Sequence, residues 1–378
     1  MLASELHFSN FLTLEHINQV KTDFGFQNAI PIEKFIMDFE TFFHIQEYIP
    51  DSIVKGGMSV PFHLPDNTAR RLSVDIDIVT SMSKDQVIEV IGKVSNKLKE
   101  AIRISENYKP NKPKKDLKLL TYFPKFDSCL GDEGEIKVDI TYDFTESIPV
   151  RKITRPIDLF ACGIDFPFNT YKIGSLIGDK ITTLGFSTIG IDTGRADEWP
   201  KQIYDVATLT KYTTSKEDFV DVADSFQVVS EYERTVFANE FTDDNIMNDI
   251  LSSMTGLLEN NNGYHLAGHY VDRHETFRNQ LLIQNRYLKQ EHATDILIVK
   301  YLVKKIKDLS NSMLTKENFA KDCFTDIQEF NRIKSLDGTG KRTEHNKIKA
   351  KHSTEEEHIK LIKAITVEQS FLYDKIIS

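Results

Sequence analysis

Cysteine is scarce in this chain, with three residues among 378. Cys129, Cys162 and Cys323 lie far apart, are odd in number and show none of the short spacings that bind zinc. The pattern argues against a secreted domain that is cross-linked by disulfides and against a metal site formed by cysteines. It is typical of reduced thiols in a reducing compartment.

The sequence also lacks the marks of export and of membrane insertion. Residues 1–18 do not show the basic, then apolar, then small-residue order of a secretory signal. No apolar run approaches the ~20 residues that a membrane span requires. We therefore predict a cytoplasmic protein with no membrane partner. With 378 residues, of which 40% are hydrophobic, the chain is long enough for two domains.

An excess of positive charge is missing as well, because the formal net charge of −10 argues against general coating of nucleic acid. Two segments are nevertheless basic. Residues 107–125 hold six lysines against one aspartate, and residues 332–352 hold seven basic residues against two acidic ones, so each has a net charge of +5. Either could follow a phosphate backbone, and the alternative is a solvated loop. The candidate RNA-binding residues are Lys109, Lys112, Lys114 and Lys115.

Two carboxylates share one face of a predicted strand at residues 71–78. Apolar and polar residues alternate there, which is the period of a half-buried strand, so Asp75 and Asp77 point the same way. A second alternating segment, residues 135–141, places Asp139 on the face opposite its isoleucines and valine. Three carboxylates on adjacent strands would repel one another by several kcal/mol without a counter-charge. The triad therefore predicts a site for one or two divalent cations.

A glycine turn precedes this strand, at residues 54–59. Its backbone amides and the hydroxyl of Ser59 could contact a phosphate. A glycine turn followed by Asp-x-Asp on the next strand predicts metal-assisted nucleotidyl transfer, in which cations neutralise charge and position the reacting groups. Oxygen ligands favour Mg²⁺ or Mn²⁺ over zinc.

The order of these motifs resembles the AbiEii/AbiGii family of nucleotidyltransferase-like toxins. The first block is Lys55-Gly56-Gly57 followed by Arg71-x-Ser73-x-Asp75-Ile76-Asp77. Two later blocks fit the same family, namely residues 179–184 with Lys180 near their start, and Arg195 followed by residues 204–209 with Asp205. Together the blocks cover about residues 50–212.

The resemblance implies roles for these residues, with Mg²⁺ or Mn²⁺ as cofactor and an NTP as co-substrate. Catalysis and metal binding would fall to Asp75, Asp77 and Asp139. Nucleotide binding would fall to Gly56, Gly57, Ser59, Arg71, Ser73, Lys180 and Asp205. It also implies a toxin of a bacterial toxin–antitoxin or abortive-infection pair, which would have a cognate antitoxin and tRNA as its acceptor.

The predicted fold class is α+β. A nucleotidyltransferase-like domain with a small mixed sheet would occupy residues 1–165, and a mainly helical domain would occupy residues 166–378, its first helices completing the active site. In the first domain we predict helices at 31–48 and 84–104 and strands at 52–55 and 116–126. In the second we predict helices at 171–184, 199–212, 216–237, 243–258, 274–287 and 293–309, with loops at 260–263 and 337–340.

Other interpretations stay open. The same carboxylates would serve a small-molecule nucleotidyltransferase of the antibiotic-modifying kind, or a nucleotide-binding regulator without turnover. Lys180 could be a surface lysine on an amphipathic helix, and Asp205 could cap a helix, pair with Arg195 or orient Lys180. His265, His269 and His274 have spacings that permit metal binding, but glycines nearby disfavour a continuous helix. His345, His352 and His358 are expected on a solvated polar tail.

Overall fold

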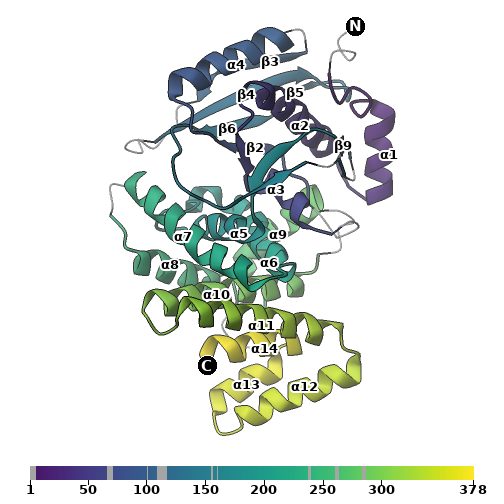
Figure 1. The fold of residues 1–378 in the computed structure, drawn as a ribbon. Coiled ribbons are helices and arrows are strands. Elements are labelled where there is room, and N and C mark those ends of the chain that lie inside the picture. The colour runs from purple at the N-terminus through teal and green to yellow at the C-terminus, as the bar shows by residue number, and fades with distance from the viewer. Residues whose placement is uncertain are drawn as a thin grey trace. The chain divides into compact units, whose positions relative to one another are not determined.

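The chain forms two compact units, which are coloured along the sequence in Figure 1. The computed structural model describes residues 6–65, 71–99, 101–108, 117–154, 156–159, 161–236, 240–259, 264–282 and 287–378. The first unit is Met1–Lys172 with Arg278–Arg286, and the second is Ile173–Phe277 with Tyr287–Ser378. The predicted mixture of helices with a mixed sheet is confirmed.

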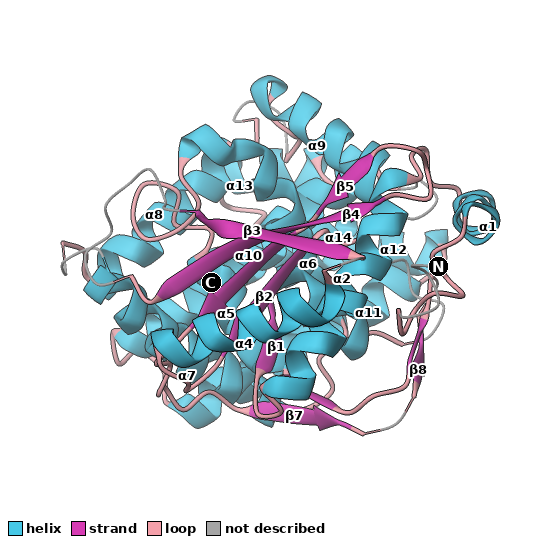
Figure 2. Ribbon diagram, turned by 90° about the horizontal axis from the view of Figure 1, so that it is seen from above, coloured by secondary structure: helices cyan, strands magenta, loops and turns pink. Residues whose placement is uncertain are grey.

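A mixed sheet forms the centre of the first unit (Figure 2, strands in magenta). Its strand order is β3-β4-β6-β2-β1-β10-β7, with β5 paired to β4, and β8 pairs with β9 in a separate ladder. The pairs β2–β6 and β1–β10 are parallel, whereas the other pairs are antiparallel. The strands are β1 (Ile53–Lys55), β2 (Asp75–Val79), β3 (Ile102–Tyr108), β4 (Leu119–Asp127), β5 (Glu133–Glu135), β6 (Lys137–Thr141), β7 (Val150–Ile153), β8 (Ile157–Asp158), β9 (Gly163–Ile164) and β10 (Phe168–Tyr171).

The helices of this unit share a hydrophobic core with the buried side chains of β2 and β6. They are α1 (Leu14–Phe24), α2 (Ile30–Tyr48), α3 (Gly56–Ser59) and α4 (Lys84–Leu98). A capping box between Ser83 and Gln86 fixes the start of α4. The predicted helix at 84–104 is wrong beyond Leu98, because Ile102 is buried and Arg103 exposed in the period of the strand β3.

The second unit is helical among its described residues. Its helices are α5 (Ile173–Thr182), α6 (Trp199–Lys211), α7 (Lys216–Val236), α8 (Asp243–Gly256), α9 (Gly268–Leu281, whose last turn belongs to the first unit), α10 (Lys289–Ser310), α11 (Lys316–Ser335), α12 (Gly338–Lys351), α13 (Glu356–Ala364) and α14 (Val367–Ile377). Helix α5 packs closely on α7, since a Cβ atom at Gly178 would lie 2.6 Å from the carbonyl oxygen of Val222. No helix in the described part of the chain is long and apolar enough to cross a bilayer.

The predicted loop at 337–340 is wrong. Asp337 is the N-cap of α12, and its carboxylate accepts a hydrogen bond of 2.7 Å from the backbone N–H of Gly340. Aspartate followed by small residues is as typical of a helix start as of a turn, so composition alone does not separate the two.

Candidate functional site

Strands β2 and β6 bring the three predicted carboxylates together. The two strands are parallel neighbours, and Asp77 lies directly opposite Asp139 in their register. Asp75 is two residues from Asp77 on β2, so both side chains point to the face that carries Asp139. The alternating pattern of the sequence thus produces a single acidic face, because Ile76, Val138 and their alternating neighbours are buried on the other side.

The glycine turn lies against this acidic face. Strand β1 pairs antiparallel with β2, with Lys55 opposite Asp77, and the chain then turns at once into α3. Gly56 has a φ of +66°, and a Cβ atom there would overlap the carboxylate of Asp77. Glycine is therefore required at this position both by the left-handed backbone and by the closeness of Asp77.

Arg71 and Ser73 hold the next residue of the turn. A Cβ atom at Gly57 would lie 2.5 Å from Nη2 of Arg71 and 2.6 Å from Oγ of Ser73. Arg71 is buried, and its Nη1 donates to the carbonyl oxygen of Leu72 at 2.8 Å. Its backbone forms an isolated antiparallel β-bridge with Leu282. Ser59 is also buried, and its hydroxyl donates to the carbonyl oxygen of Gly56 at 2.9 Å. That hydroxyl is engaged within the turn itself.

The surroundings of Asp77 disfavour its charged form. Burial, and after it the negative charge of Asp139, raises the pKa of Asp77, whereas Lys55 lowers it. Asp139 accepts a hydrogen bond of 2.5 Å from the hydroxyl of Thr121 on β4 and forms an ion pair with Lys137. Burial lowers the pKa of Lys137, but the neighbouring carboxylates outweigh it, so the pKa is raised overall. The chain therefore supplies part of the counter-charge itself.

Sequence reasoning missed Thr121, Lys137 and a fourth carboxyl group, Asp38. Burial raises the pKa of Asp38 well above its usual range, and the charge of Asp75 adds to the effect. Neither oxygen of Asp38 has a hydrogen-bond partner among the described residues. The available signals were the strand period at Thr121 and Lys137, and a single aspartate among the buried apolar residues of α2.

In the second unit, Lys180 and Asp205 form a buried ion pair. Lys180 of α5 lies 2.7 Å from Asp205 of α6, and their side chains are 2% and 0% exposed. Gln202 accepts a second contact from Nζ of Lys180 at 3.1 Å. Lys180 is thus not a surface lysine, and Asp205 pairs with it.

The structure describes the second basic segment, but it does not describe the four candidate RNA-binding lysines of the first. Lys109, Lys112, Lys114 and Lys115 lie outside the described residues, so their predicted RNA contact stays a prediction. In residues 332–352 several cations pair with carboxylates of the same unit: Arg332 with Glu329 and Glu344, Lys341 with Glu368, Lys347 with Glu344, and Lys351 with Asp374. These ion pairs neutralise much of the positive charge that the sequence predicts for the second segment.

The histidines also differ from expectation. His265 and His269 are exposed, while His274 is buried and its ring stacks on His292 at 4.9 Å. His352, which was expected on a solvated tail, is buried as well. Burial of a histidine requires partners within the fold, and the sequence gives no sign of them.

Comparison with protein families gives one match. The family described as "Nucleotidyl transferase AbiEii toxin, Type IV TA system" matches residues 43–263. This span is more than half of the chain and contains the glycine turn, the acidic triad and the Lys180–Asp205 pair. Comparison with curated proteins gives no match.

Proposed function

Because the chain belongs to the AbiEii family of nucleotidyl transferase toxins of type IV toxin–antitoxin systems, we propose that it transfers a nucleotide from an NTP to tRNA. In this proposal the first unit has a nucleotidyltransferase-like fold and carries the catalytic carboxylates. The protein would act in the cytoplasm as the toxin of an abortive-infection pair, with a separately encoded antitoxin as its partner.

The observation that carries the proposal is the acidic face beside the glycine turn. Asp77 and Asp139 are opposite each other in adjacent parallel strands, and Gly56 lies against Asp77. A purely structural role would not require three carboxylates on one face, since like charges at this separation destabilise the fold.

The donor set fits a hard divalent cation. Asp75, Asp77 and Asp139 offer only oxygen ligands, which suit Mg²⁺ or Mn²⁺. Such a cation would supply charge neutralisation for the phosphates and activate the attacking hydroxyl. Lys137 now contacts Asp139, so we expect this lysine to move aside or to pair with a phosphate when the site is loaded.

The remaining residues would position the nucleotide. Backbone N–H groups at Gly57 and the following residues would bind outer phosphates, since the Ser59 hydroxyl is engaged with Gly56. Arg71 and Ser73 would act by holding Gly57 in place. The family resemblance also assigns Lys180 and Asp205 to nucleotide binding, a role that stays a prediction for this buried pair.

Transfer to RNA can be tested directly. The protein is incubated with Mg²⁺, each labelled NTP and total tRNA, and the RNA is examined for label. The wild type and a control, Asp51→Asn in the exposed turn after α2, should label RNA, whereas Asp77→Asn should fall to background. An Asp77→Asn variant that transfers at the wild-type rate would show that the acidic face is not the active site.

A small cationic acceptor is the second candidate, favoured by the net charge of −10. Reversing Lys112, Lys114 and Lys115 to glutamate separates the two. If the acceptor is RNA, affinity should fall and its dependence on salt should flatten by roughly 0.7–0.9 in log–log slope for each lost phosphate contact. Unchanged transfer to tRNA in this variant would favour the small acceptor.

A further inference from the structure

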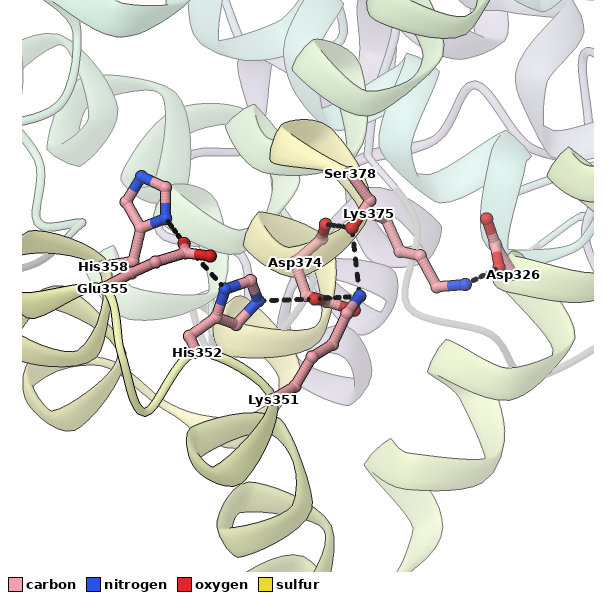
Figure 3. A network of polar contacts seen from close by, with 8 residues as sticks. All are labelled: Asp326, Lys351, His352, Glu355, His358, Asp374, Lys375 and Ser378. Atoms are coloured by element: carbon pink, nitrogen blue, oxygen red, sulfur yellow. Dashed lines mark hydrogen bonds and ion pairs between the residues drawn. The ribbon is translucent and has the colours of Figure 1, made fainter.

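Two histidines and a glutamate converge where α12 meets α13 (Figure 3). His352 follows the last residue of α12, Glu355 precedes α13 and His358 lies in the first turn of α13. Nδ1 of His352 lies 3.2 Å from Oε2 of Glu355, and Nδ1 of His358 contacts the same oxygen. One potential ligand atom from each residue lies within 4.8 Å of the others.

Nε2 of His352, the ring nitrogen that does not contact Glu355, already forms a hydrogen bond. Nε2 of His352 lies 2.7 Å from Oδ1 of Asp374, and Nζ of Lys351 lies 2.6 Å from the same oxygen. Because a carboxylate accepts, Nε2 carries the proton of this hydrogen bond. In a neutral imidazole the other nitrogen, Nδ1, then presents a lone pair.

That lone pair faces a carboxylate oxygen, and two acceptors at 3.2 Å need a cation or a proton between them. A shared proton or a bound metal ion would satisfy both atoms. A metal ion would use Nδ1 of His358 as a further ligand; without an ion, this nitrogen donates an N–H to the same oxygen. Moreover, a carboxylate that holds the outer N–H of a histidine is the arrangement found behind metal-binding histidines, where it fixes the ring and its tautomer.

We propose that His352, Glu355 and His358 bind Zn²⁺. A tetrahedral zinc ion with bonds of about 2.0–2.1 Å places its ligand atoms roughly 3.3 Å apart. This is close to the 3.2 Å between Nδ1 of His352 and Oε2 of Glu355, whereas Nδ1 of His358, which contacts that oxygen directly, has to move outward to bind the ion. Two imidazole nitrogens and one carboxylate oxygen form a set that zinc accepts, with a water molecule in the fourth position. The ion joins the end of α12 to the start of α13 and, through Asp374, to α14. This site is independent of the nucleotidyl transfer proposed above.

Zinc binding is measured on the full chain after removal of metal with a chelator. Zn²⁺ is titrated in competition with a chromophoric chelator. Glu355 and His358 are the residues to change, because their side chains are 49% and 37% exposed and their substitution should not disturb folding. The matched controls are Glu356→Gln and His269→Gln, both exposed.

We expect one equivalent of zinc in the wild type and in both controls. Glu355→Gln and His358→Gln should bind at least tenfold more weakly, and Asp374→Asn should lose about 10–100-fold, as is typical for the partner of a metal-binding histidine. Zn²⁺ should raise the melting temperature of the wild type and the controls but not of the two ligand variants.

Two results would overturn the proposal. One is a wild type that takes up no zinc from the competing chelator and shows no shift in melting temperature. The other is zinc binding in Glu355→Gln and His358→Gln equal to that of the controls, with circular dichroism showing all of them folded. The second result would place the zinc elsewhere on the chain.

Discussion

A single added methyl group decides whether the glycine turn can lie against Asp77. Gly56→Ala introduces a Cβ that overlaps the Asp77 carboxylate in a backbone with φ of +66°. We expect a loss of at least about 1–2 kcal/mol from the left-handed backbone alone, together with loss of nucleotide binding. Chemical denaturation measures the first effect and calorimetric titration with NTP and Mg²⁺ the second.

Gly92 provides the control for this change. It lies exposed in α4, and a Cβ atom there meets nothing within 4 Å. Gly92→Ala should therefore stabilise the protein by about 0.5–1 kcal/mol, as expected for alanine in a helix interior. Equal effects of the two substitutions would mean that the turn does not press on Asp77.

Replacing Asp38 should raise the stability of the protein and lower its activity. Its raised pKa means that the folded chain binds a proton more tightly than the unfolded chain, so its ionisation costs stability as pH rises above about 4. Asp38→Asn should therefore stabilise the protein at pH 7 and leave it unchanged near pH 4, while it lowers transfer activity if the group supports the acidic face. Urea unfolding at both pH values, with Asp51→Asn as control, measures the first effect. Destabilisation at pH 7 would contradict it.

His63 has the opposite dependence on pH. Burial, followed by the charge of Arg151, lowers the pKa of His63 to about 4. Between pH 6.5 and about 4 the unfolded chain binds a proton that the folded chain does not, so stability should fall with falling pH by up to about 1.4 kcal/mol per pH unit. His63→Asn should remove this part of the slope, and the exposed control His265→Asn should not. Identical slopes for all three proteins would show that His63 titrates normally.

At the scale of elements, the ion pair between α5 and α6 should behave as one unit. Asp205→Asn leaves the charge of Lys180 buried, which costs about 3–5 kcal/mol, whereas replacing both residues with Met and Leu should cost far less. Glu198→Gln, which removes the contact with Lys201 near the start of α6, should cost less than about 1 kcal/mol. Urea unfolding of the four proteins gives the comparison. A double variant that loses as much stability as Asp205→Asn would show that the buried charge of Lys180 is not the source of the loss.

The strands show what sequence can and cannot predict. Alternation along residues 71–78 and 135–141 was enough to place Asp75, Asp77 and Asp139 on polar faces, because a strand has only two sides. The parallel pairing of β2 with β6, which sets Asp77 opposite Asp139, depends on contacts between segments far apart in sequence. For the same reason the sequence did not reveal the buried pair that Lys180 makes. Lys137, by contrast, is two residues from Asp139 on the same strand, so the strand period could have identified it.

The end of α4 and the last four helices were not predicted correctly. The apolar period identified α4, but Ile102 and the residues after it continue an apolar pattern that fits a helix or a strand equally well. Helices α11 to α14 carry many charges and were not predicted, although Thr315, Asp337 and Thr366 each provide an N-cap. Capping residues are informative only when the helix that they start is already suspected.

At the scale of the whole molecule, the first unit is built from two separate stretches of chain. Residues Arg278–Arg286 belong to it, and the backbone N–H of Leu72 donates to the carbonyl oxygen of Leu281 at 2.8 Å. A fragment of residues 1–172 should therefore melt at a lower temperature than the full chain. A peptide of residues 278–286 added in excess should restore part of the loss, and a scrambled peptide should not. A fragment as stable as the full chain would show that this segment is dispensable.

The same discontinuity sets an order in time during synthesis. Arg278 is added about 105 residues after Lys172, which at 5–20 residues per second corresponds to roughly 5–20 s. The bridge between Arg71 and Leu282 cannot form before then. The ribosome that makes this protein is therefore not exposed to a completed first unit until about half of the second unit has been translated.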